Sequence, residues 1–313
     1  MTITQLKYVL AVAEHKNFTL AADKCFVTQP TLSMQIQKIE EELNIQIFDR
    51  TKKPIQLTDI GQKIVNQAKN IVNEADRIQD IVEQQKGFVG GEFRLGIIPT
   101  IMPTLLPMFL NNFIKKYPKV KLIIEELNTD EIITKLNNGH LDAAIAATPL
   151  EEEKIKEIVL YFEPFVAYIP ENHQHYQKQE IEVADLNLDE ILLLQDGHCF
   201  RDGILNLCKN NSRNEINHFQ IESGSFETLI KLADEGLGTT LLPYLHTLDL
   251  KDSDKTKLRH FKEPKPAREV SLIFPKSELK IHIIDALRST IAGVVKGAIV
   301  FQNVEIISPI QKK

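Results

Sequence analysis

The pattern of apolar residues changes at the short segment 87–91, which reads GFVGG. Before this segment, apolar residues recur every three or four positions, which predicts helices. After it, short runs rich in Val, Ile and Leu alternate with helical stretches, which predicts strands joined by helical crossovers. A chain of 313 residues has room for two or three domains. The glycine-rich segment therefore predicts a boundary between a mainly helical part and an α/β part.

Two short helices are expected near the N-terminus, one after Thr19 and one after Thr28. Thr19 and Thr28 can each cap a helix, and Pro30 is tolerated in the first turn of the second. The spacing in the second helix places four apolar residues on one face, namely Leu32, Ile36, Ile39 and Leu43. Two short helices joined by about three residues predict a helix-turn-helix.

The opposite face of the second helix is polar, and no acidic residue occurs between Lys24 and Lys38. Amides and hydroxyls at the start of such a helix suit base edges in the major groove of double-stranded DNA. The candidate DNA contacts are Thr28, Gln29, Pro30, Thr31, Ser33, Met34, Gln35 and Lys38. A small helical bundle with an ordinary solvated face would show the same pattern, so both interpretations stay open.

The segment 47–58, IFDRTKKPIQLT, places basic residues around a proline before an alternating stretch. It predicts a short hairpin, or wing, that lays Arg50, Lys52 and Lys53 on phosphates. A solvated basic turn is the alternative.

Residues 58–86 predict one long helix with a heptad seam. The seam consists of Ile64, Ala68, Ile71, Ala75, Ile78 and Val82. Such a narrow seam favours pairing with a second copy of the chain, hence a homodimer. The alternative is a seam that is buried against its own chain.

Beyond the boundary, strands are expected at 92–98, 121–127 and 141–148, with helices between them. A second such set is expected at 164–170, 190–195, 218–223 and 239–243, with helices near 201–208 and 225–236. Strand 269–274 is expected to return to the first lobe, before a terminal helix near 277–298. Since ligands bind at the carboxyl ends of strands in such sheets, the loops at Thr100, Thr129 and 197–199 are candidate sites.

Several functional classes are disfavoured. The chain has no phosphate-binding glycine loop, nucleophile elbow or HExxH motif, and the pair His173 and His175 stands without supporting ligands. We therefore expect no cofactor and no metal. The N-terminus does not have the pattern of a signal peptide, and no apolar run reaches the length of a membrane span. We expect a cytoplasmic protein, where static disulfides are rare.

The segment 21–62 resembles the winged helix-turn-helix and linker of LysR-type transcriptional regulators. The resemblance rests on Ala21-Ala22, Thr28-Gln29-Pro30, Ser33, Leu43, Phe48, Arg50, Thr58 and Gly61, together with GLGTTLLP at 236–243. It implies a DNA-binding domain over 1–58, a linker and dimerisation helix over 59–87, and a two-lobed regulatory domain over 88–313 that is similar to periplasmic binding proteins. It also implies a non-enzymatic regulator, commonly tetrameric, that binds promoter DNA and acts on RNA polymerase.

Within this family, GHCFRD at 197–202 followed by Cys208 resembles the members that sense hydrogen peroxide and activate oxidative-stress genes. That resemblance implies that Cys199 is the peroxidatic cysteine and Cys208 the resolving one. It also places peroxide near Thr100 and Thr129. His198 and Arg201 flank Cys199 in the sequence, and the resemblance assigns Arg268 as a cation near it.

The chemistry of peroxide sensing makes two demands on these residues. Because thiolate attacks peroxide, Cys199 needs a lowered pKa or a local base. The sulfenic acid then condenses with a second thiol. Nine residues of helix separate α-carbons by about 13 Å, whereas a disulfide needs less than about 7 Å. A helix over 200–208 must therefore refold to close the bond. Cys25, in the helix-turn-helix, is expected to be a core residue.

Two other functions remain open. A LysR-type regulator that binds a small metabolite between its lobes would carry Cys199 incidentally. A thiol peroxidase would turn over quickly, but the DNA-binding half and the lack of a recycling CxxC motif disfavour it. Peroxide-dependent formation of a 199–208 disulfide, compared with the rate of turnover, separates all three.

Overall fold

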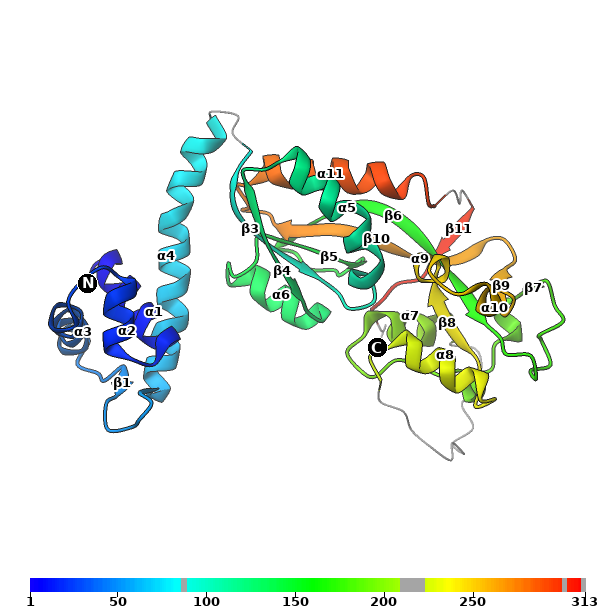
Figure 1. Cartoon of the computed structure of the whole chain (residues 1–313), viewed down its shortest axis with the longest axis horizontal. Coiled ribbons are helices and arrows are strands. Elements are labelled where there is room, and N and C mark those ends of the chain that lie inside the picture. Colours follow the sequence, from blue (N-terminus) through cyan, green and yellow to red (C-terminus); the bar gives the residue numbers. More distant parts are fainter. Residues whose placement is uncertain (86–88, 209–222, 300–302, 311–313) are drawn as a thin grey trace. The chain divides into compact units, whose positions relative to one another are not determined.

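The computed structural model describes residues 1–85, 89–208, 223–299 and 303–310. The chain forms two compact units, Met1–Phe88 and Val89–Lys313 (Figure 1). Among the described residues, no helix is both long and apolar enough to cross a membrane.

The N-terminal unit begins with three helices: α1 (Ile3–His15), α2 (Phe18–Lys24) and α3 (Gln29–Leu43). Thr28 caps α3 as predicted, and its side-chain oxygen accepts a hydrogen bond from the main chain of Thr31. The predicted cap of α2 is wrong. Asn17, not Thr19, caps this helix, because the Asn17 Oδ1 atom accepts hydrogen bonds from the next main-chain NH groups at 2.8 and 3.1 Å.

The apolar stripe of α3 forms the centre of this unit's core. Leu32, Ile36 and Ile39 are fully buried and pack with residues of α1 and α2. Leu43, the fourth predicted member, is 38% exposed because the helix ends there, with Asn44 in the left-handed conformation. The helix-turn-helix prediction is confirmed.

A two-stranded antiparallel hairpin follows, formed by β1 (Phe48–Asp49) and β2 (Gln56–Leu57). The predicted wing is therefore present. Gly61 then allows the next helix to approach the hairpin closely, because a β-carbon at this position would lie 2.0 Å from the Ile47 carbonyl oxygen.

The long helix α4 (Asp59–Gln85) carries the predicted heptad seam. The first half of the seam packs within the chain, since Ala68 and Ile71 contact Leu6 and Leu10 of α1. Further along, Ile78 is 66% exposed. The first part of the seam is thus buried against its own chain, and pairing with a second copy stays a prediction for the exposed part. The side chain of Val82 lies outside the described residues.

The first lobe of the C-terminal unit has the predicted β-α-β-α-β order: β3 (Gly91–Ile97), α5 (Met102–Lys116), β4 (Val120–Glu126), α6 (Thr129–Asn137) and β5 (Ala143–Thr148). Strand β3 pairs in parallel with both β4 and β5. Helices α5 and α11 (Ile281–Val295) lie on one side of these strands and α6 on the other (Figure 1). A set of buried residues that we call the first-lobe cluster, with Phe93, Phe109 and Ile145 at its centre, fills the space between these elements.

Two long antiparallel strands connect the lobes: β6 (Ile155–Tyr168) and β10 (Lys265–Pro275). Strand β10 also pairs with β5, which confirms that the strand predicted at 269–274 returns to the first lobe.

The second lobe differs from the predicted parallel repeat. Strands β8 (Thr240–Pro243) and β9 (Leu258–Phe261) pair antiparallel with β6, while the short β7 (Glu180–Ile181) is parallel to β9. The reason is that β6 continues from the first lobe into the second and provides the strand against which the new ones form. The run 190–195 makes an isolated bridge at Ile191 rather than a strand, and most of the run 218–223 lies outside the described residues.

The helices of the second lobe are α7 (Cys199–Leu207), α8 (Phe226–Asp234), α9 (Tyr244–Leu248) and α10 (Asp252–Lys255), with 3₁₀ turns at Val183–Asp185 and Leu188–Glu190. They enclose a second set of buried residues, the second-lobe cluster, which includes Phe165, Tyr168 and Phe200. The final strand β11 (Val304–Ile306) pairs in parallel with the beginning of β10.

Candidate functional site

The exposed surface at the beginning of α3 carries most of the predicted DNA contacts. Thr28, Gln29, Pro30, Thr31, Met34 and Lys38 are all exposed. Thr28 and Thr31 share a hydroxyl–hydroxyl hydrogen bond of 2.8 Å, which orders the first turn of the helix. Gln35 differs from these residues, because its Oε1 atom accepts a hydrogen bond from Gln5 of α1. It therefore fixes α3 to α1 as well as lying beside the polar face.

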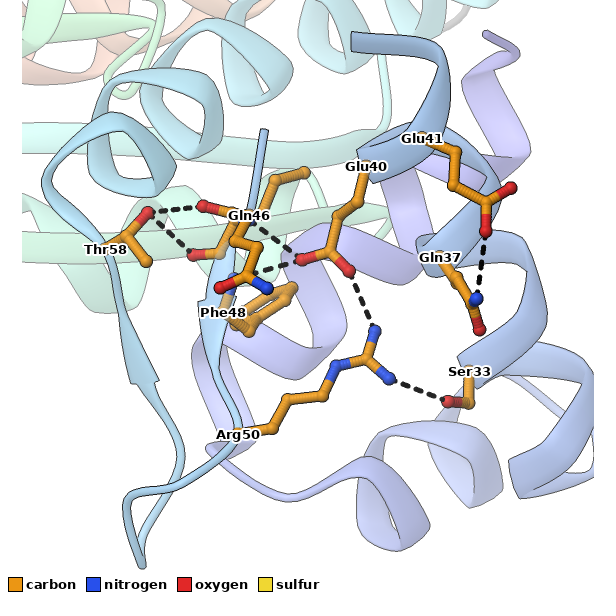
Figure 2. A network of polar contacts seen from close by, with 9 residues as sticks. Ser33, Gln37, Glu40, Glu41, Gln46, Phe48, Arg50 and Thr58 are labelled. Carbon is orange, nitrogen blue, oxygen red and sulfur yellow. Dashed lines mark hydrogen bonds and ion pairs between the residues drawn. The ribbon is translucent and has the colours of Figure 1, made fainter. Parts of the chain in front are cut away.

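The wing is joined to α3 by a carboxylate that the sequence patterns did not identify. Glu40 accepts hydrogen bonds from the main chain of Ile47 and Phe48 through one oxygen, and pairs with Arg50 at 2.8 Å through the other (Figure 2). Arg50 also donates to Ser33, and its guanidinium lies 5.1 Å from the centre of the Phe18 ring. Arg50 thus links the wing to α3.

Lys52 and Lys53 are exposed in the turn of the hairpin. They are therefore available to phosphate groups without first breaking a structural contact of the kind that holds Arg50.

Cys199 is the first residue of α7, and it is 8% exposed. Burial raises the pKa of its thiol, while the Arg268 charge, the Thr129 side chain and the Ala147 main chain oppose that rise. The balance is a raised pKa, so in this structure the Cys199 thiol does not have the lowered pKa that is one of the two ways to make it reactive. The favourable groups are present, but the loss of water around the sulfur outweighs them.

Thr129 lies at the beginning of α6, at the carboxyl end of β4, as predicted for a binding loop. Its hydroxyl oxygen is buried and makes no well-formed hydrogen bond within the described part of the chain. It lies near enough to Cys199 to lower the pKa of the thiol. The Thr129 hydroxyl thus lies beside the Cys199 sulfur and acts on it.

Arg268 is 3% exposed and is held on three sides. It donates to Glu163 at 2.7 and 2.9 Å, and to the Thr100 hydroxyl and carbonyl at 2.8 and 3.1 Å. Its guanidinium carbon lies 5.2 Å from the centre of the Phe200 ring. The structure thus brings Thr100 and Arg268 together.

Glu163 was not predicted from the sequence. It is 1% exposed, and it also accepts a hydrogen bond from the main chain of Leu245. The only available signal was a carboxylate inside the apolar run LYFEPFVAYI. Its pairing with Arg268, 105 positions away, follows from the register of β6 and β10.

His198 and Arg201 flank Cys199 but have different surroundings. His198 is buried, which lowers its pKa against the opposing charge of Glu126, so the ring is neutral near pH 7. Arg201 forms an ion pair with Asp196 at 2.8 Å and donates to the Leu194 carbonyl. Arg201 is thus engaged with Asp196 and Leu194, whereas Arg268 is the cation that acts on the Cys199 thiol. A role for Arg201 in the peroxide pocket stays a prediction.

Cys208 is the C-terminal cap of α7 and is 1% exposed. Burial raises its pKa to about 11, so it is a protonated thiol in this state. All three cysteines are free, and Cys25 packs against the N-terminal core as predicted. Within the described residues, no cluster of side chains is suited to hold a metal ion.

Known families match both units of the chain. Residues 3–62 match the bacterial regulatory helix-turn-helix protein model of the lysR family, and residues 86–295 match the LysR substrate binding domain. The chain belongs to the LysR family of transcriptional regulators. It is therefore a DNA-binding regulator rather than an enzyme, as the sequence predicted.

Two relatives show how far the similarity extends. The DNA-binding transcriptional dual regulator OxyR of Escherichia coli is 34% identical over 297 residues, which cover 94% of this chain and 97% of that protein. The HTH-type transcriptional regulator EstR of Acinetobacter baylyi is 31% identical over 88% of this chain and 91% of its own length.

Solved structures agree with this LysR-type fold. A full-length OxyR variant from Pseudomonas aeruginosa has a TM-score of 0.74 at 34% identity, covering 93% of this chain and 98% of that one. A hydrogen-peroxide-bound OxyR mutant from Corynebacterium glutamicum has a TM-score of 0.62 at 28% identity, covering 97% of this chain and 98% of that one.

Proposed function

We propose that this LysR-type protein is a hydrogen-peroxide-responsive transcriptional regulator, with Cys199 as the peroxidatic and Cys208 as the resolving cysteine. The observation that carries the proposal is the pair of free thiols at the two ends of α7, one of them beside Arg268 and Thr129. Relatives named hydrogen peroxide-inducible genes activator, such as that of Pectobacterium carotovorum at 33% identity, support it.

In the first step, the Cys199 sulfur attacks one peroxide oxygen and the O–O bond breaks. The thiol proton ends on the departing oxygen, so one thiol and one hydrogen peroxide give one sulfenic acid and one water. Arg268 and the Thr129 hydroxyl stabilise the thiolate, since each lowers the pKa of Cys199. The Thr129 hydroxyl can also donate to or accept from a peroxide oxygen.

In the second step, the Cys208 thiol attacks the Cys199 sulfur, water leaves, and a disulfide forms. With Cys199 and Cys208 at opposite ends of α7, the α-carbons are about 13 Å apart, so the helix must unwind. The unwound segment is the element that we expect to change the arrangement of the regulatory domain and thereby the affinity for promoter DNA.

The helix-turn-helix and wing provide the DNA contacts. Thr28, Gln29, Pro30, Thr31, Ser33, Met34 and Lys38 would face the major groove, with Lys52 and Lys53 on phosphates. The exposed Ile78 side of α4 would pair with a second copy of the chain, and tetramers would form through further contacts. RNA polymerase is the partner expected at the promoter.

Peptide mass spectrometry of the purified full-length protein after sub-stoichiometric peroxide tests the proposal. A disulfide joining Cys199 and Cys208, restored to two thiols by dithiothreitol, is the expected result. A promoter fragment binding assay on the same samples should show different affinities for the two forms. If both thiols remain fully reactive to maleimide after excess peroxide, the chain is not a peroxide sensor.

A further inference from the structure

Asn206, near the end of α7, is bonded to the C-terminal segment of the chain. Its side-chain Nδ2 atom donates to the carbonyl of Ser308 at 2.8 Å and to the carbonyl of Ile310 at 2.9 Å. The Oδ1 atom of the same amide is buried without a hydrogen-bond partner in the described ranges. The donor half of the Asn206 amide therefore connects α7 to the C-terminal segment, and the acceptor half makes no hydrogen bond there.

The other end of this C-terminal segment is fixed beside Arg268. Strand β11 pairs with Lys265–Ala267 of β10, and the Ile307 main chain donates to the Ala267 carbonyl at 2.8 Å. Ile307 packs against the second-lobe cluster, and Pro309 is buried. Residues 303–310 thus run from the strand that carries Arg268 to the helix that carries both cysteines.

We propose that Asn206 is a positioning residue that clasps α7 to residues 308–310, and that this clasp controls how fast Cys208 resolves oxidised Cys199. The inference rests on the proposed function, since it concerns the second step of that reaction. Residue 206 lies between the two cysteines, so α7 cannot unwind around it while both hydrogen bonds persist. The clasp holds the helical, reduced form, and disulfide formation releases residues 308–310 from α7.

Only the donor half of the Asn206 amide is hydrogen-bonded, which suits a contact that must break when α7 unwinds and form again when it refolds. A buried polar atom without a partner lowers the stability of the state that contains it. Unwinding α7 exposes the Oδ1 atom of Asn206 to water, which partly offsets the loss of the two hydrogen bonds. The clasp therefore restrains the helix without locking it.

Rapid-quench kinetics on the full-length protein test the clasp. Dimedone traps sulfenic acid at Cys199, and mass spectrometry counts the disulfide. In Asn206→Ala, we expect Cys199 to be oxidised at the wild-type rate. The disulfide should then form about tenfold faster, because the variant lacks two ordinary hydrogen bonds that hold α7 in its helical form. The thiol–disulfide equilibrium with glutathione should shift toward the disulfide by the same factor.

A chain that ends at Ile307 provides a second, independent variant, because it removes both acceptor carbonyls and leaves Asn206 intact. When this truncation is combined with Asn206→Ala, disulfide formation should be no faster than in either variant alone, because both changes break the same hydrogen bonds. Leu205→Ala is the matched control on α7, because it weakens packing against the second-lobe cluster and leaves the Asn206 hydrogen bonds in place. Its effect on the rate of disulfide formation should multiply with that of the truncation.

Asn303→Ala removes only a surface hydrogen bond to Glu263 and should leave both rates unchanged. The clasp would be overturned if Asn206→Ala formed the disulfide at the wild-type rate, or if the rate effects of Asn206→Ala and the truncation multiplied. Either result would leave the proposed sensor function intact. Absence of any disulfide in the wild-type protein would instead refute the proposed function.

Discussion

Cys199 begins α7 and Cys208 caps its other end, but the two belong to different hydrophobic clusters. Cys199 packs with the first-lobe cluster, and Cys208 packs with the second-lobe cluster. The helix between them is therefore held at one end by each lobe. Bonding the two sulfurs must remove at least one of them from its cluster, so the redox state of the pair is coupled to packing in both lobes.

The unequal surroundings of the two thiols predict unequal roles. Cys199→Ser should abolish reaction with peroxide and switching of DNA affinity. Cys208→Ser should still be oxidised, but should stop at sulfenic acid or a mixed disulfide, because the resolving thiol is removed. Mass spectrometry after brief exposure to peroxide distinguishes these products. If Cys208 is oxidised in the Cys199 variant at the wild-type rate, the roles are reversed.

The raised pKa of Cys199 predicts how its reactivity depends on pH. Only the thiolate reacts, and burial keeps the thiol protonated through neutral pH. Alkylation of Cys199 by iodoacetamide should therefore still accelerate as pH rises through about 9, above the usual cysteine range. A plateau below about pH 7 would show that the thiolate is already dominant there.

Arg268 is the cation that opposes this rise, so removing it should raise the pKa of Cys199 further. In Arg268→Met, alkylation at neutral pH should fall about tenfold for each added pKa unit. Because Glu163 would be left as an unpaired buried charge, the melting temperature should also fall. The double variant Glu163→Gln, Arg268→Met avoids that charge and should show the same loss of thiol reactivity.

Arg201→Ala is the matched control for Arg268. It removes a cation next to Cys199 in sequence, but one that pairs with the exposed Asp196. We expect wild-type alkylation of Cys199 in this variant. A loss as large as that of Arg268→Met would mean that Arg201 reaches the sulfur after all.

The exposed part of the α4 seam predicts the dimer contact. Ile78→Asp places an unpaired charge where a second copy would pack, and should raise the dimer dissociation constant by at least about tenfold. Analytical ultracentrifugation measures this. Gln67→Asp, at an exposed position of the same helix, is the control. Ile71→Asp is unsuitable, because Ile71 already packs in the cluster that α4 forms with α1.

Local patterns and long-range pairings differ in how well the sequence predicts them. The stripe Leu32, Ile36 and Ile39 and the β-α-β-α-β order of the first lobe depend on neighbours a few residues apart, and both are confirmed. The second lobe was predicted incorrectly because one strand of 14 residues, β6, extends through both lobes and imposes antiparallel partners.

The thiol site shows the same limit. The place of Arg268 near Cys199 came only from a family resemblance, and its hydrogen bond to Thr100, 168 positions away, was not predicted. The Glu163 pairing had no sequence signal before the register of β6 and β10 was known. The raised pKa of Cys199 depends on burial, which charged and polar neighbours in sequence do not reveal.

The wing allows a final prediction, in which two basic residues of one hairpin contribute to DNA binding differently. Lys52 is exposed, so Lys52→Ala should remove one phosphate contact and lower the slope of log K against log salt by about 1. Arg50 is held by Glu40 and Ser33, so Arg50→Ala should weaken the attachment of the wing to α3 (Figure 2). Its loss of affinity should persist at high salt and accompany a lower melting temperature. Salt titrations of promoter binding separate the two effects: if Arg50→Ala changes only the salt slope and leaves the melting temperature unchanged, Arg50 is a phosphate contact and its bond to Glu40 opens on DNA.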